Sequence, residues 1–353
     1  MPSRDRSTAA TTIVLALAFA LAACGPQPAA SGSCATATPP NPAGGCDASA
    51  APTALKVGLG YLPSVQFAPF YFAQQAGYYA DAGLVVTFEN KIDPDLVTLV
   101  GQGALDIGVA DGTSVIPAVS QSIPIRYVAT IYGTYPSIVF AKASSGIKAA
   151  ADLKGKKIGI PGKYGSSWIM LQALLKSAGL SPDDATVVEY PDYGQGVAVQ
   201  QGAVAAATGF ANNEPVQLQL SGSPAVVLHV DQVVALPGPG LIASTQTLDT
   251  KGDAVEAFIA ATLRAMTEIA ATPSLGLDAA IVAVPELGKD RATQAAILDA
   301  TIATWSAADS GGVFGTIDTA GWAASIAYMT TLGLVPNPVT VDGVVRTDLV
   351  PQG

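Results

Sequence analysis

The chain has 353 residues, only 12% of them charged, and its net charge is −10. An acidic chain with so few basic side chains cannot neutralise a phosphate backbone, which excludes nucleic acid as its partner. The length is sufficient for two domains that each have a sizeable hydrophobic core.

Residues 1–23 have the pattern of a signal peptide. Arg4 and Arg6 precede the apolar run TTIVLALAFALAA at residues 11–23. A run of about thirteen residues is too short to span a bilayer but suits an export signal. The run ends in Leu21-Ala22-Ala23-Cys24, which resembles the lipobox of bacterial lipoproteins. We therefore expect a lipid on Cys24 that anchors the protein outside the cytoplasmic membrane. The alternative, a buried helix with an incidental cysteine, is disfavoured by the charged flank.

Residues 24–53 are predicted to form a flexible linker, because they are nearly all Ala, Pro, Gly, Ser, Thr and Asn. Cys34 and Cys46 lie in this segment, and in an oxidising compartment they can pair or remain free. Neither has the His or Cys neighbours of a metal site, and we predict no metal. No later apolar run reaches membrane-spanning length.

From residue 54, short β-rich runs alternate with helical runs, which predicts an α/β fold with mostly parallel sheets flanked by helices. The first series of strands is expected at residues 55–61, 84–90, 106–111 and 125–132. The second series is expected as strands at 156–160 and 185–190 and one ending at Phe210, with helices at 166–178 and 195–201. Beyond His229 the pattern predicts helices at 248–271, 293–305 and 319–332.

The two series resemble one another. VGQGALDIGVADGTS at residues 100–114 and VQQGAVAAATGFANNEP at 199–215 share a helix end, a small-residue strand and a polar turn. Two similar α/β halves predict two lobes with a ligand cleft at the carboxyl ends of their strands. We expect the first lobe at residues 54–142, the second at 143–235, a return to the first at 236–345 and a tail at 346–353.

The sequence is poor in catalytic groups. His229 is the only histidine, and it lies in the alternating apolar run AVVLHVDQVV, which is typical of a strand. The chain lacks GxSxG, HExxH and Walker sequences, and its glycine-rich turns lack the GxGxxG spacing. We predict no catalytic residues, no enzyme activity and no cofactor.

Four turns lie where a predicted strand leads into a helix: that of Tyr61, Asp111–Ser114, Gly162–Trp168 and Asn212–Pro215. Their Ser, Thr and Asn side chains can simply cap helices. All four, however, combine such residues with aromatics or a carboxylate, which favours a site for one polar small molecule.

The stretch GYLPSVQFAPFYFAQQAGYYADAGL at residues 60–84 holds seven of the chain's 23 aromatic side chains. Phe67, Phe70 and Tyr71 share one face of a helix there, whereas Phe72 points elsewhere. We expect two or three of the seven in the cleft and the rest in the core.

This stretch resembles the signature of the periplasmic solute-binding proteins of ABC importers whose ligands include thiamine pyrimidine precursors, riboflavin, aliphatic sulfonates and nitrate. ADLKGKKIGIPG at 151–162, the Asn212–Pro215 turn and GWAASIAYMTTLGLV at 321–335 extend the resemblance over nearly the whole body. It implies a two-lobed type II binding protein that closes about a hinge. It also implies a monomer that delivers its ligand to an ABC permease and its ATPase.

Within that family, QFAPFYFAQ and Asn212–Pro215 are most similar to riboflavin-binding members. The resemblance implies that aromatic rings stack on a flavin, while polar turns bind its imide edge and ribityl hydroxyls. The candidate ligand-binding residues are Tyr61, Gln66, Phe67, Tyr71, Asp111, Thr113, Tyr132, Tyr135, Tyr164, Ser166, Ser167, Trp168, Asn213 and Glu214.

Other functions remain open. A thiamine pyrimidine precursor is the alternative ligand, although Gln66 stands where many pyrimidine-binding relatives carry histidine. A sulfonate or nitrate requires a basic residue, and among the turns only Lys163 is one. The related pyrimidine synthase uses iron with a cysteine-rich motif and a histidine, whereas this chain has no cysteine after Cys46. A lipoprotein that binds protein partners, with its aromatics in the core, is the last alternative.

Overall fold

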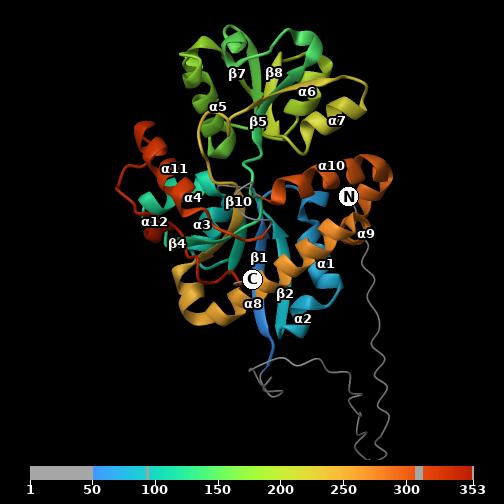
Figure 1. Cartoon of the computed structure of the whole chain (residues 1–353), viewed down its shortest axis with the longest axis vertical. Helices are drawn as coiled ribbons and strands as arrows, with labels where there is room; N and C mark the ends of the chain where they lie inside the picture. The colour runs from blue at the N-terminus through green and yellow to red at the C-terminus, as the bar shows by residue number, and fades with distance from the viewer. Residues whose placement is uncertain (1–50, 93–94, 307–312, 352–353) are drawn as a thin grey trace, which may run out of the picture. The chain divides into compact units, whose positions relative to one another are not determined.

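The computed structural model describes residues 51–92, 95–306 and 313–351. The predicted signal peptide, Cys24, Cys34, Cys46 and nearly all of the predicted linker lie outside these residues. The described chain forms two lobes, each built on a five-stranded sheet (Figure 1).

The first sheet has the strand order β2 (Leu84–Asn90), β1 (Thr53–Leu59), β3 (Ile107–Asp111), β10 (Pro239–Ser244) and β4 (Ile125–Thr130). Strand β1 pairs in parallel with β2 and β3, whereas β10 runs antiparallel to β3 and β4. Four of the five strands therefore point the same way, which confirms the predicted mostly parallel sheet.

The second sheet repeats this arrangement with the order β7 (Thr186–Glu189), β6 (Lys157–Ile160), β8 (Ala206–Phe210), β5 (Ser137–Lys142) and β9 (Ala225–His229). Its fourth strand, β5, is again the antiparallel one. Strand β8 thus occupies the position that β3 has in the first sheet, which gives the repeated sequence pattern a structural meaning.

The chain crosses between the sheets twice, after β4 and after β9. Because β5 belongs to the second sheet, the expected lobe boundary at residue 142 lies one strand too late. The residues after His229 were expected to be helical, but Pro239–Ser244 form β10 in the middle of the first sheet. The two crossings lie against each other, since the backbone N–H groups of Ile131 and Tyr132 both donate to Pro239 O, at 3.1 and 2.9 Å.

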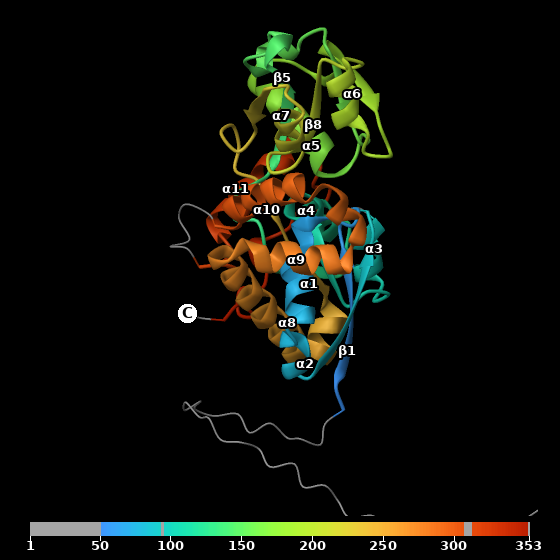
Figure 2. The same cartoon turned by 90° about the vertical axis from the view of Figure 1, so that its right-hand side faces the viewer.

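Helices cover both faces of each sheet, as expected for sheets of mostly parallel strands. On one face of the first sheet lie α1 (Ala68–Gln75), α2 (Tyr78–Asp81), α8 (Thr245–Ala271), α9 (Pro273–Ala283) and α10 (Arg291–Trp305) (Figure 2). On the other lie α3 (Asp95–Gly101), α4 (Gly112–Ser120), α11 (Thr319–Thr331) and α12 (Val341–Val344). The second sheet is covered by α5 (Gly165–Ser177) on one face and by α6 (Gln195–Gln201) and α7 (Glu214–Leu220) on the other.

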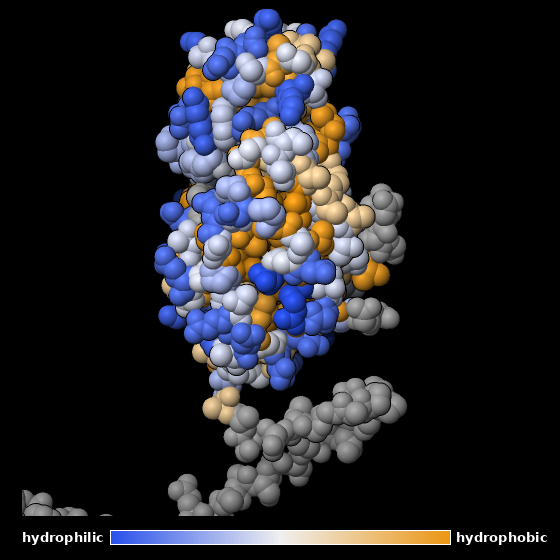
Figure 3. Space-filling model, turned by 90° about the vertical axis from the view of Figure 1, so that its left-hand side faces the viewer, coloured by the Kyte–Doolittle hydropathy of each residue, from blue (hydrophilic) through white to orange (hydrophobic). Residues whose placement is uncertain are grey.

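Helix α11 and the end of the described chain pack against the apolar clusters of the lobes. Tyr328 of α11 contacts the apolar clusters of both lobes. Half-buried apolar side chains around α11 and α12 belong to the hydrophobic band in Figure 3, which shows the side of the molecule where these two helices lie. Leu349 and Val350, within the predicted tail, are buried in the first lobe. The first lobe therefore extends beyond residue 345.

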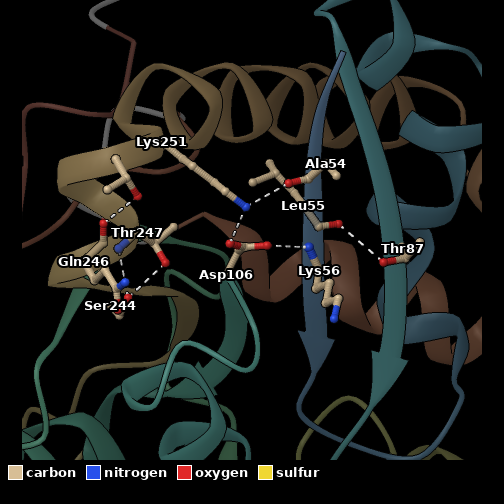
Figure 4. Close-up of polar contacts among 10 residues, drawn as sticks. Ala54, Leu55, Lys56, Thr87, Asp106, Ser244, Gln246, Thr247 and Lys251 are labelled. Atoms are coloured by element: carbon tan, nitrogen blue, oxygen red, sulfur yellow. Dashed lines mark hydrogen bonds and ion pairs between the residues drawn. The ribbon is translucent and has the colours of Figure 1, made fainter. Parts of the chain in front are cut away.

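The edge of the first sheet where β1 and β3 begin is held by an ion pair (Figure 4). Asp106 lies just before β3, and its carboxylate accepts from Lys251 Nζ and from the backbone N–H of Lys56, both at 2.8 Å. Lys251 also donates to Ala54 O at 3.0 Å, from a point in α8 where its φ of −135° and ψ of 25° interrupt the helix. This cluster, the Asp106 clamp, joins β1, β3 and α8.

Within the described residues, no helix combines the length and the apolar character needed to cross a membrane.

Candidate functional site

A cleft of about 910 Å³, counting the part open to solvent, is lined by residues of both lobes. Its walls are built by turns that follow β1 and β3 in the first sheet and β6, β7 and β8 in the second. This is where ligands bind on open α/β sheets.

Aromatic rings line much of the cleft: Tyr61, Phe67, Tyr132, Tyr164, Tyr193 and Phe210. Tyr61 of the first lobe and Tyr193 of the second meet edge to face, with ring centroids 5.1 Å apart and an interplanar angle of 85°. Tyr132 and Phe210 form a second such pair at 6.5 Å. The cleft therefore presents aromatic faces and edges from both lobes to one ligand.

A buried amide connects the lobes beside this wall. Asn212 Nδ2 donates to Gln66 Oε1 at 3.1 Å and to Thr301 Oγ1 at 2.8 Å. The Tyr132 hydroxyl donates to the same Gln66 oxygen at 3.4 Å. Gln66, which lines the cleft, is thereby fixed by contacts from the second lobe and from the first crossing.

Two carboxyl groups open onto the cleft from equivalent places in the two lobes. Asp111 ends β3, and Glu214 begins α7 just after β8. Glu214 Oε2 accepts from the Phe210 backbone N–H at 2.9 Å, and its Oε1 accepts from Gln195 Nε2 at 3.4 Å. A Cβ atom at Gly209 would lie 2.7 Å from Glu214 Oε2, so glycine is required there to make room for the carboxyl group.

The environment of these acids disfavours their charged forms. Burial raises the pKa of Glu214 to about 7, although the hydrogen bond from Phe210 opposes the rise. Burial raises the pKa of Asp111 to about 6, and Ser166 of the second lobe opposes it by hydrogen bonding to the carboxyl. Burial, with a contribution from the Glu214 charge, also raises the pKa of the Tyr61 hydroxyl. The cleft thus holds two weak acids that are partly protonated near neutrality.

Most of the predicted site residues lie in the cleft wall: Tyr61, Gln66, Phe67, Asp111, Tyr132, Tyr164, Ser166, Ser167, Asn213 and Glu214. Tyr71 does not, because the chain changes helix type in front of it. Val65–Phe67 form a 3₁₀ turn and α1 begins at Ala68, so Phe67 faces the cleft while Tyr71 packs edge to face on Phe88 in the core. The other aromatics of the opening stretch, apart from Tyr61 and Phe67, also pack in the first lobe.

Three further predicted residues lie outside the wall. Thr113 is fully buried in the first turn of α4, and Tyr135 is buried in the apolar cluster of the second lobe. Trp168 packs against that same cluster, with Lys163 Nζ 5.9 Å from the centre of its ring. The expectation that these three side chains face the ligand does not match the structure. In each case the α-helix or the crossing turns the side chain into the lobe.

Tyr193, Gln195 and Phe210 line the cleft but were not predicted. The first two follow β7 in the turn PDYGQG, another passage from strand to helix that combines an aromatic with small residues. The rule that selected the other four turns would have selected this one. Phe210 is the last residue of β8 and lies two residues before Asn212, where the Asn212–Pro215 turn begins.

The histidine of the chain lies outside the cleft. His229 ends β9, its Nδ1 is 3.7 Å from Asp231 Oδ1, and it is not among the cleft residues. Within the described residues, no group of three or more His, Cys, Asp or Glu side chains is placed to hold a metal ion.

Two α/β lobes that enclose an aromatic, polar cleft define a solute-binding protein of the periplasmic type. The chain belongs to the NMT1/THI5-like family, whose model matches residues 64–275.

The relatives include binding proteins and enzymes. The chain is 32% identical over 334 residues to the riboflavin-binding protein RibY of Chloroflexus aurantiacus, covering 91% of this chain and 94% of that one. It is 28% identical over 171 residues to 4-amino-5-hydroxymethyl-2-methylpyrimidine phosphate synthase of Legionella pneumophila, covering 48% and 52%. Among solved structures, the alkanesulfonate-binding protein SsuA of Xanthomonas axonopodis, bound to MOPS, has a TM-score of 0.67 at 20% identity, covering 84% of this chain and 99% of that one. This last likeness concerns the fold.

Proposed function

We propose that the protein captures riboflavin outside the cytoplasmic membrane and delivers it to an ABC permease. The observation that carries the proposal is the cleft wall, which combines six aromatic rings with hydrogen-bonding side chains from both lobes. A flavin has a large planar ring for the former and an imide edge and hydroxyls for the latter. The extended similarity to RibY supports the same ligand.

Capture proceeds by hinge closure. The two crossings, after β4 and after β9, are the covalent links between the sheets of the two lobes. A ligand that contacts both walls stabilises the closed arrangement relative to an open one, and it shifts the equilibrium by its difference in affinity for the two. Small-angle scattering is expected to show a smaller radius of gyration when riboflavin is added.

Flavin fluorescence provides the direct test. Riboflavin emission is expected to be quenched on titration with the purified protein, because tyrosine rings stacked on a flavin quench its fluorescence. The quenching is expected to saturate at one flavin per chain. A titration without quenching would refute riboflavin as the ligand.

A thiamine pyrimidine precursor is the second candidate, since half of the chain is similar to the pyrimidine phosphate synthases. Binding of 4-amino-5-hydroxymethyl-2-methylpyrimidine by calorimetry, in a protein that does not bind riboflavin, would establish it. The synthase activity itself is disfavoured, because the body of the chain has no cysteine after Cys46.

The lipid on Cys24 would keep the protein beside its permease. Replacing Cys24 with serine is expected to move the protein from the membrane fraction to the soluble fraction after export. An unchanged distribution would refute the anchor without affecting the ligand proposal.

A further inference from the structure

The charges of the cleft wall are all of one sign. Asp111 and Glu214 contribute carboxyl groups, and among the cleft-lining residues in the described chain there is no Lys, Arg or His. Lys163 belongs to the turn that supplies Tyr164, but its ammonium group lies over the ring of Trp168 outside the wall. An anion entering this cleft would therefore meet two acids and no counter-charge from its lining.

The wall also has a surplus of hydrogen-bond acceptors. Gln195 is only 1% exposed, and its Nε2 donates to Glu214 Oε1 and to Thr208 O, each at 3.4 Å. Its Oε1 has no partner within the described part of the chain. A buried acceptor without a partner is unfavourable, and this oxygen adds to the excess of acceptors around the Glu214 carboxyl group.

Two glycines leave space for the side chains of Gln195 and Glu214. A Cβ atom at Gly159 would lie 3.1 Å from Gln195 Cβ, and one at Gly209 would lie 2.7 Å from Glu214 Oε2. These two positions leave room for two polar side chains against the backbone of the second sheet. The acceptors are thus built into the wall.

We propose that the cleft selects an uncharged, donor-rich heteroaromatic ligand and rejects its phosphate ester and other anions, with Asp111 and Glu214 as the residues that determine this selectivity. The inference rests on the proposed function and refines it: the free vitamin is bound and its 5′-phosphate is refused. Like charges brought together in a poorly hydrated cleft repel each other strongly, whereas hydroxyl donors satisfy the carboxyl oxygens. The cleft thereby differs in preference from the sulfonate-binding proteins that share its fold.

Titration of the purified protein with riboflavin and with flavin mononucleotide at pH 8, followed by flavin fluorescence, tests this proposal. These ligands differ only in the phosphate group. We expect the wild-type protein to bind riboflavin about 100-fold more tightly than the phosphate ester. The nearly isosteric D111N/E214Q variant is expected to reduce this ratio by about tenfold or more. The matched control E189Q removes one exposed carboxylate outside the cleft and is expected to leave the ratio unchanged.

Salt dependence separates charge from shape. Because ions screen electrostatic repulsion, the affinity for flavin mononucleotide is expected to rise with ionic strength while that for riboflavin stays constant. Equal wild-type affinities for the two flavins would overturn the selectivity, and a ratio that D111N/E214Q leaves unchanged would overturn the role of the acids. Both results would leave riboflavin capture intact, whereas binding of neither flavin would overturn the proposed function together with this inference. Thermal melting of each variant verifies that it is folded.

Discussion

One aspartate, Asp106, directly precedes strand β3 and another, Asp111, ends it, and the two carboxyl groups have different environments. At the edge away from the cleft, the Asp106 carboxylate is paired with Lys251 and accepts a backbone N–H. At the cleft edge, Asp111 faces a wall without a cation, and burial raises its pKa to about 6. One carboxylate stabilises the lobe, whereas the other is held at a cost to stability. Such a cost is typical of a site that is completed by a ligand.

The largest effect is expected at the far edge. Asp106→Ala would remove the carboxylate that pairs with the Lys251 ammonium, 34% exposed, which would keep only Ala54 O, and would remove the acceptor of the Lys56 backbone N–H. We expect a loss of about 2 kcal/mol in the free energy of unfolding, measured by urea denaturation. Riboflavin affinity should stay within about twofold.

The exposed ion pair between Lys289 and Glu286 provides the matched control, since its side chains are 78% and 72% exposed. Glu286→Ala is expected to change stability by less than about 0.5 kcal/mol. A similar loss in both variants would remove the distinction between a clamp and an ordinary surface pair.

A second substitution tests the space reserved for Glu214. In Gly209→Ala, the new Cβ would approach Glu214 Oε2 to 2.7 Å and Phe140 Cε1 to 3.0 Å, so the carboxyl group must move. We expect a loss of about 2 kcal/mol in stability together with weaker riboflavin binding.

Comparison with Glu214→Ala and the double variant isolates the contact. If the clash with the carboxyl group causes the loss, Gly209→Ala should cost about 1 kcal/mol less when Glu214 is already alanine. Additive losses would instead locate the strain at Phe140.

The dependence of stability on pH also distinguishes the cleft edge of the first sheet, where Asp111 lies, from the far edge, where Asp106 lies. The pKa values of Asp111 and Glu214 rise on folding from 3.8 to about 6 and from 4.5 to about 7. The folded protein therefore retains protons that the unfolded chain has released. Because of this, stability without ligand is expected to fall as the pH rises from about 4 to about 7.

In D111N/E214Q, this part of the pH dependence should disappear. We expect the stability of the variant to rise relative to that of the wild type as the pH increases from 4 to 8, measured by urea denaturation at each pH. Parallel stability curves for the two proteins would mean that the acids are solvated like those at the surface.

The smallest effect concerns the aromatic wall. Tyr61→Ala removes one ring of the pair between the lobes and is expected to weaken riboflavin binding by about tenfold, with the melting temperature nearly unchanged. Tyr71→Ala is its counterpart in the core and is expected to lower stability. The opposite assignment of the two phenotypes would place the ligand on the other face of the opening stretch.

Local pattern was sufficient to predict the alternating elements and to locate the cleft, because strand ends carry the turns that face a ligand. Tyr61, Asp111 and Glu214 were found in this way. The same rule applies to the turn of Tyr193 and Gln195, which the sequence analysis did not single out. What the rule cannot supply is the direction of a side chain within a turn.

The remaining differences have causes that the local pattern does not show. Tyr71 was misplaced because the 3₁₀ turn Val65–Phe67 precedes α1, and hydrophobic periodicity alone does not mark where one helix type changes into the other. Strand β10 is a short segment that begins with Pro-Gly, and its partners β3 and β4 lie more than a hundred residues earlier in the chain. Pairing at that separation leaves no local periodicity to detect.

The strand order also has a consequence for how such proteins diversify. All five strands of the second sheet fall between Ser137 and His229, so this lobe is one uninterrupted insertion into the first. It carries Tyr164, Tyr193, Gln195 and Glu214, and it begins and ends at crossings that lie side by side. Exchange of this one segment between relatives would replace an entire wall of the cleft in a single step and leave the sequence of the first lobe unchanged.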